Sequence, residues 1–242
     1  MFIIFSLQAF GQEKDANFYA KAAEKDWIAG KLKSAYKNYY KAAELGKNYL
    51  YYIKSAEAYC FGHNNSKEKT RQTIESLYNK SFEIKPFNTE GLLSRASYKR
   101  FDAEYESALN DLDTLIKRDS NCIDAYLLKA STLLEIRDTT NGFKTYDLAI
   151  KKAPQSRLSE IYLKLGGDCY VYNHWTRCIF GYTKALDLIG ETNFKEFFYC
   201  NLTSAYSNIG DLSNSCKFYK RCDISKRSWL KNAKVIIKNC GQ

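Results

Sequence analysis

The chain has 242 residues, of which 45% are hydrophobic and 26% charged, and its net charge is +10 at pH 7. This composition is ordinary for a globular protein, and the presence of only two prolines and twelve glycines disfavours a many-turned β-sandwich, a collagen-like chain and a Pro-rich linker. A packed, helix-rich protein is therefore expected.

The first segment, MFIIFSLQAFGQ, is apolar over its first five residues and has small residues one and three places before a cut ahead of Gln12. This pattern is typical of the back half of a signal peptide, although the basic n-region is missing. We expect residues 1–11 to be a truncated signal peptide and the protein to be exported, periplasmic or extracellular. If the segment is instead an ordinary N-terminal helix end, a cytoplasmic location is expected. Eight cysteines agree with an oxidising compartment.

A repeat runs through most of the remaining chain. Pro86 and Pro154 lie 68 residues apart, which is twice 34, and six copies of one helix-period pattern can be aligned. The first helix of each copy has a large apolar slot, followed four residues later by a slot that is small in five copies: Tyr19/Ala23, Tyr52/Ala56, Leu92/Ala96, Tyr126/Ala130, Tyr162/Gly166 and Tyr199/Thr203. The second helix has a large slot, followed three residues later by a slot that is mostly small: Tyr39/Ala42, Tyr78/Ser81, Leu112/Leu115, Tyr146/Ala149, Tyr182/Ala185 and Tyr219/Cys222. Small side chains let antiparallel helices approach closely, so these tyrosines are predicted to be core.

The order of these slots, with Leu165-Gly166 and the terminal prolines, resembles the tetratricopeptide repeat (TPR). The resemblance covers about residues 16–223 and implies an all-α protein, a right-handed α-solenoid of about six helix hairpins whose first helices line a concave face. The third copy departs from the pattern, with leucines at three slots. The second copy has six extra residues within 61–69, where we expect a surface loop, either a tolerated insertion or a partner contact.

Residues 224–242 are predicted to form a C-terminal capping helix. Trp229, Ala233, Ile236 and Cys240 fall on one helical stripe of this segment. A hairpin that turns near Ser228 would bring Cys216 opposite Cys240, and the ending also resembles that of bacterial exported TPR proteins whose last repeat and cap share a cysteine pair. We therefore predict a Cys216–Cys240 disulfide.

The other cysteines are open to several interpretations. Cys169 and Cys178 flank a helix turn and could form a second disulfide, or could bind zinc together with His174. Both alternatives rank below a third, in which Cys178 and Cys222 are small core residues in slots that hold Ala or Gly in other copies. No metal or cofactor is expected.

Residues for catalysis are scarce. The chain has only two histidines, and no nucleophile-elbow, zinc-protease, phosphate-loop or dinucleotide-binding motif is present. An enzyme is not expected, nor is a small-molecule substrate.

A local excess of positive charge marks the end of the chain, where residues 216–242 carry eight Lys or Arg and one Asp. Four of these cations, Arg227, Lys231, Lys234 and Lys238, share one face of the predicted cap. The favoured interpretation is that this basic face is the polar exterior that a solenoid cap needs. The alternative interpretation is that it acts as an adaptor for an anionic membrane surface or a polyanion. Nucleic acid is not an expected partner, because no stacking aromatics interleave with the lysines.

We predict a non-enzymatic scaffold that binds a peptide or helix of another protein in the concave groove. The candidate groove residues, from the repeat geometry, are Trp27, Ile53, Arg100, Leu127, Leu134, Leu163, Tyr170 and Asn201. The Lys/Asn/Arg clamp with which some TPR proteins bind a C-terminal carboxylate is not reproduced in these first helices, so that class of partner is not expected.

Overall fold

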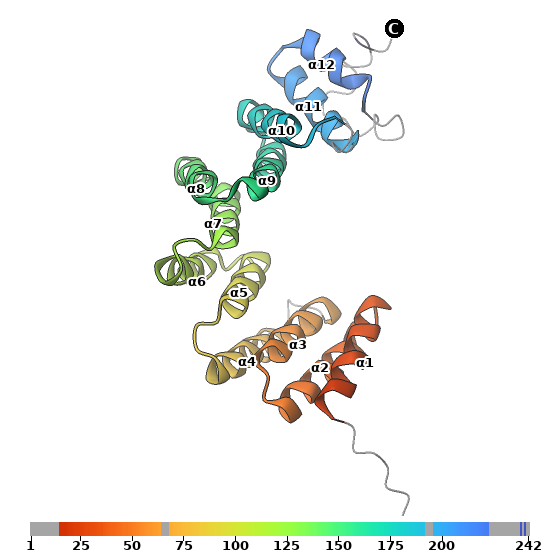
Figure 1. Ribbon diagram of the computed structural model, residues 1–242, viewed down its shortest axis with the longest axis vertical. Helices are drawn as coiled ribbons and strands as arrows, with labels where there is room; N and C mark the ends of the chain where they lie inside the picture. Colours follow the sequence, from red (N-terminus) through yellow and green to blue (C-terminus); the bar gives the residue numbers. More distant parts are fainter. Residues whose placement is uncertain (1–14, 64–67, 192–195, 223–237, 239, 241–242) are drawn as a thin grey trace, which may run out of the picture. The chain divides into compact units, whose positions relative to one another are not determined.

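Helices alternate with short turns along the chain. The computed structural model describes residues 15–63, 68–191, 196–222, 238 and 240, which contain twelve α-helices, one 3-10 turn and no strand (Figure 1). The helices are α1 (Ala16–Ile28), α2 (Leu32–Gly46), α3 (Tyr49–Gly62), α4 (Glu68–Ile84), α5 (Thr89–Phe101), α6 (Tyr105–Arg118), α7 (Ile123–Glu135), α8 (Thr139–Lys152), α9 (Leu158–Val171), α10 (Trp175–Ile189), α11 (Glu196–Asn208) and α12 (Leu212–Tyr219), and the 3-10 turn is Gln155–Arg157. Successive helices pair into six hairpins, which confirms the predicted all-α repeat architecture.

The chain divides into two compact units, Met1–Leu115 and Ile116–Gln242, and the boundary falls within α6. In the first unit α1 to α4 pack in chain order, and α5 packs against α3 and α4. In the second unit α7 to α12 pack in the same successive manner around one core that extends from Ile123 to Phe218.

The repeat slots form the cores of both units. The small slots Ala23, Ala56, Ala96, Ala130 and Thr203 have no exposed surface, and Gly166 is buried as well. All the large slots of the second helices are buried: Tyr39, Tyr78, Leu112, Tyr146, Tyr182 and Tyr219. The prediction that the repeat tyrosines are core is confirmed for eight of the ten, because a small residue on one helix leaves room for the ring of the next, while Tyr19 and Tyr162 are half-buried.

Five hairpin turns share one backbone conformation. The residue eleven places after each first-helix slot has positive φ, namely Gly30 (70°), Ala103 (62°), Arg137 (69°), Asn173 (65°) and Gly210 (83°). The next residue donates its amide to the carbonyl five places back, as in Lys31 to Asp26 (2.8 Å) and Glu104 to Lys99 (2.8 Å). This bonding is the Schellman motif, which satisfies the last carbonyls of a helix and reverses the chain.

The second hairpin differs from the prediction. Phe61 and Gly62 still belong to α3, while Glu68 and Lys69 already belong to α4, so the helices extend into the predicted loop from both sides. Residues 64–67 lie outside the described part of the chain. The hydrogen-bonded turns of a helix satisfy more backbone groups than a loop does, which favours extending both helices.

An ion network joins α5 and α6, in the copy that departs most from the repeat. Arg95 donates to both carboxylate oxygens of Asp111 at 2.8 and 2.6 Å, and Lys99 Nζ lies 3.3 Å from the same carboxylate. Asp111 and Lys99 are buried. A bidentate, desolvated pair of this kind fixes the register of two helices in a way that leucine contacts alone do not.

Two disulfides fasten the last hairpin. The predicted Cys216–Cys240 disulfide is confirmed, with a Cα–Cα distance of 4.9 Å. The prediction that Cys222 is a small core thiol in an alanine slot is wrong. Cys222 forms a disulfide with Cys200 across the α11–α12 hairpin, with a Cα–Cα distance of 4.7 Å. Cys169 and Cys178 do not form the alternative disulfide; they are buried thiols, as are Cys60 and Cys122.

Several predicted features lie outside the described residues. These are the signal peptide at 1–11 and, except for Lys238 and Cys240, the capping helix at 224–242 with Arg227, Lys231 and Lys234. Lys238 is helical and exposed. Among the described residues, no helix combines the length and the hydropathy required to cross a lipid bilayer.

Candidate functional site

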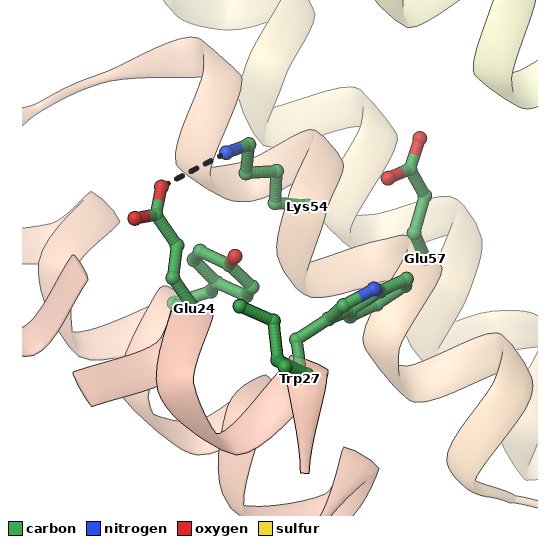
Figure 2. A pocket seen from close by; sticks show the side chains of 6 residues that line it. Glu24, Trp27, Lys54 and Glu57 are labelled. Carbon is green, nitrogen blue, oxygen red and sulfur yellow. Dashed lines mark hydrogen bonds and ion pairs between the residues drawn. The ribbon is translucent and has the colours of Figure 1, made fainter. Parts of the chain in front are cut away.

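A hollow of about 370 Å³ opens on the first unit between α1 and α3 (Figure 2). Five of its six lining residues come from these two first helices and one from α2: Glu24, Trp27, Ile28, Lys54, Glu57 and Tyr39. The volume falls in the range of sites that bind small ligands or single side chains.

Charged groups lie on both sides of the hollow. Figure 2 shows the Lys54 amine pointing toward Glu24, and the two side chains form an ion pair of 3.4 Å. The same amine lies 5.5 Å from the centroid of the Tyr39 ring. Glu57 accepts a hydrogen bond of 2.7 Å from Ser94 Oγ on α5. Burial, followed by the carboxylates of Glu24 and Glu57, raises the pKa of the Tyr39 phenol to about 12.

Large apolar side chains border the hollow and face solvent. Ile28 is 86% exposed and Phe61 66% exposed, and the Phe61 ring meets the Trp27 indole edge-on with 6.1 Å between ring centroids. We call Trp27, Ile28 and Phe61 the Trp27 surface. It joins the end of α1 to the end of α3 through the contact between the half-buried Trp27 and Phe61.

The sequence interpretation missed Ile28 and Phe61. Both stand nine residues after the first-helix slot, and Phe101 on α5 stands at the same position and is 71% exposed. In the second unit Val171 on α9 occupies this position and is 62% exposed. A recurring apolar residue just before a polar turn was the available signal, because the repeat needs no hydrophobic side chain there.

The predicted groove residues are divided between surface and core. Trp27 lines the hollow, whereas Ile53, Leu127 and Leu134 are buried and belong to the core. Ile53 and Leu127 keep only 4% and 6% of their surface exposed, and Leu134 keeps none. These three side chains contribute to the core, and their assignment to a partner-binding groove stays a prediction.

The other groove candidates are half-buried, and they are Arg100, Leu163, Tyr170 and Asn201. Leu163 and Tyr170 pack against the core of the second unit. Asn201 donates a hydrogen bond of 2.9 Å to the Tyr182 hydroxyl, so its amide holds α11 against α10.

The described residues contain no group of three or more His, Cys, Asp or Glu side chains placed to hold a metal ion. The zinc alternative for Cys169, His174 and Cys178 is therefore not supported by the structure. The His174 ring instead meets the Phe143 ring edge-on at 5.3 Å, and burial followed by the charge of Arg137 lowers its pKa.

Comparison with solved structures identifies the fold. No family model matches the sequence, and no curated protein matches it. Among solved structures, a tetratricopeptide repeat protein from Parabacteroides merdae is similar over 93% of this chain and 89% of that one, with a TM-score of 0.60 and 14% identity. The chain has the TPR fold.

Two other structures extend the TPR likeness over nearly the whole chain. PilW, a widely conserved type IV pilus biogenesis factor, has a TM-score of 0.68 at 11% identity and covers 92% of this chain and 98% of its own. PilF of Pseudomonas aeruginosa has a TM-score of 0.63 at 10% identity and covers 94% of this chain and 97% of its own. Within the TPR fold, the hollow and the Trp27 surface lie on the first helices of two consecutive hairpins.

Proposed function

We propose that the protein is a non-enzymatic scaffold that binds an extended segment of another protein across the first helices of the first unit. The observation that carries the proposal is the exposure of Ile28 and Phe61 around Trp27, beside an open hollow. A contiguous apolar surface with a polar rim is typical of a protein-binding site, and an aromatic anchor at its centre is typical of a binding hot spot.

The fold supports this proposal. A row of helix hairpins buries each face against its neighbours and leaves the first-helix ends available, so side chains at those ends can change without loss of the core. The similarity to PilW and PilF, which belong to pilus biogenesis, agrees with a role in the assembly of other proteins.

The two disulfides support an oxidising location for this scaffold, outside the cytosol, because disulfides persist there and are rare in reducing compartments. The proposed leader at residues 1–11 agrees with export. The alternative of a membrane-surface adaptor depends on Arg227, Lys231, Lys234 and Lys238, of which only Lys238 is described.

Site-specific photocrosslinking in the cells that produce the protein tests the scaffold. A benzophenone side chain at Phe61 should give discrete adducts with a partner protein, because position 61 faces solvent within the Trp27 surface. The matched control carries the same group at Leu45, an exposed position on α2. Ile28→Ser should abolish the adducts. Adducts of equal yield at positions 45 and 61, or adducts that survive Ile28→Ser, would contradict the proposal.

A further inference from the structure

We infer that the hollow between α1 and α3 is a subsite for a basic side chain, Lys or Arg, of the partner segment. The inference rests on the proposed function, because it names the partner chemistry of the same surface. Since the hollow adjoins Trp27 and Ile28, the expected segment has a basic residue next to a large apolar one.

The charge of the lining favours a cation. Two carboxylates, Glu24 and Glu57, face one amine, Lys54, so the empty hollow carries an unbalanced negative charge. An acidic segment would add to that charge, whereas a basic side chain would balance it. The rings of Trp27 and Tyr39 add faces that attract cations.

Lys54 shows how the hollow holds an amine. Its Nζ lies 5.5 Å from the centroid of the Tyr39 ring. The same Nζ lies 3.4 Å from a carboxylate oxygen of Glu24 (Figure 2). The side chains of Lys54 and Glu24 are 43% and 55% exposed, so their ion pair is weak and Lys54 can turn out to solvent. An arriving amine or guanidinium can then occupy the same place.

Glu57 is the second acceptor. It lies beside Trp27 in Figure 2, and its hydrogen bond from Ser94 uses one of several acceptor positions on the carboxylate. Within the described part of the chain it is in no ion pair, so its charge is available to a partner. Glu24 and Glu57 therefore flank the entering cation from α1 and α3.

Selection from a random dodecapeptide display library tests the inference. The targets are the immobilised full-length protein, Glu24→Gln/Glu57→Gln, Lys54→Met and a control, Glu83→Gln/Glu106→Gln, which neutralises two exposed carboxylates on α4 and α6. Peptides selected on the wild type and on the control should be enriched in Lys or Arg next to a large apolar residue. The enrichment should disappear on Glu24→Gln/Glu57→Gln.

One selected peptide is then measured by calorimetry against each variant. Its affinity should fall about tenfold on Glu24→Gln/Glu57→Gln, the range expected for the loss of two partly exposed ion pairs, and rise about threefold on Lys54→Met, which removes a competing amine. Norleucine in place of the basic residue of the peptide should cost at least about tenfold on the wild type, because it removes the cation–π contact together with the ion pairs.

The outcomes separate the two proposals. Selected peptides that lack a basic residue, yet lose binding in Ile28→Ser/Phe61→Ser, would overturn the basic subsite and leave the scaffold proposal standing. Failure to select any peptide whose binding depends on Ile28 and Phe61 would overturn both.

Discussion

Gly181 of α10 lies so close to Gly166 of α9 that a Cβ atom at position 181 would be 2.6 Å from the Gly166 backbone nitrogen. The same atom would lie 2.8 Å from the carbonyl oxygen of Tyr162. Both clashes are with backbone, which cannot rotate away, so this pair of glycines sets the closest approach within the fifth hairpin.

Gly181→Ala should therefore lower the free energy of unfolding by about 1–3 kcal/mol, the usual cost of overpacking, measured by urea denaturation. Gly167→Ala is the matched control on the same hairpin, because its added Cβ would meet only the Tyr182 hydroxyl, at 3.6 Å. Alanine should raise stability there by up to about 1 kcal/mol through helix propensity. Equal effects of the two substitutions would show that the helices can separate without cost.

Ala103 has the left-handed conformation that glycine adopts most readily. Ala103→Gly should raise the free energy of unfolding by about 0.5–1 kcal/mol, because the steric strain exceeds the extra entropy of an unfolded glycine. The control is Ala29→Gly in the first turn, where φ is −78° and no strain is relieved. That substitution should lower the free energy of unfolding by a few tenths of a kcal/mol, so a gain there would contradict the argument.

Asp111 neutralises two partly or fully buried cations on α5. Asp111→Asn should lower the free energy of unfolding by about 3–5 kcal/mol, because Arg95 and Lys99 then lose the carboxylate with which they are ion-paired. Asp147→Asn provides the comparison, since its 3.4 Å pair with Arg177 is exposed on both sides and should contribute less than about 1 kcal/mol. Similar losses in the two variants would mean that the α5–α6 network is as well solvated as a surface pair.

The Cys200–Cys222 disulfide closes a sequence separation of 22 residues. Cys200→Ser/Cys222→Ser should lower the free energy of unfolding by about 3 kcal/mol on the chain-entropy model, measured without reductant. Mass mapping of the unreduced wild type should find this pair and Cys216–Cys240, and any other pairing contradicts the structure. Cys169, whose pKa burial raises to about 12, should react with iodoacetamide at neutral pH only after unfolding.

Buried tyrosines predict a loss of stability at high pH. Burial is the largest cause that raises the pKa of Tyr39 and Tyr52 to about 12, and it raises the pKa values of Tyr78 and Tyr146 further. Below pH ~10 these phenols are protonated in both states; above it the unfolded chain loses protons first, so stability falls as pH rises toward ~12. Tyrosinate absorbance should then appear together with the loss of helical circular dichroism. Ionisation of every tyrosine while the helices stay intact would rule out the link between tyrosine burial and stability at high pH.

The hairpins could be predicted because most of them place a small residue opposite an aromatic ring, and this pairing recurs in every copy except the third, which has leucines in the large slots. Ala23, Ala56 and Ala130 are such small residues in the first helices. The Cys200–Cys222 disulfide could have been found by the same reasoning that gave Cys216–Cys240, since these cysteines stand eleven residues before and eleven residues after Asp211, which follows the Gly210 turn. Cys169 and Cys178 also stand at equal distances from the turn at Asn173-His174 and do not form a disulfide, so symmetric spacing alone does not fix a pairing, which also depends on the distance and direction of the Cβ atoms.

The site was harder to predict because burial depends on neighbouring helices. Leu134 and Trp27 both lie near the ends of first helices, yet Leu134 is fully buried and Trp27 opens on the hollow. The position of the next hairpin decides whether such a residue is buried or exposed, and the sequence pattern of one helix does not give that position. The exposure of Phe61 follows from its place at the last turn of α3, beyond the reach of the core.

The two disulfides overlap along the chain, because Cys216 of the second pair lies between Cys200 and Cys222 of the first pair. All four buried thiols precede these four cysteines in the sequence. During synthesis the N-terminal hairpins emerge first and fold as units. Cys60, Cys122, Cys169 and Cys178 can therefore be enclosed before the last four cysteines meet an oxidant. Burial in this way protects the correct pairing, and only the last four cysteines then depend on an oxidase or an isomerase.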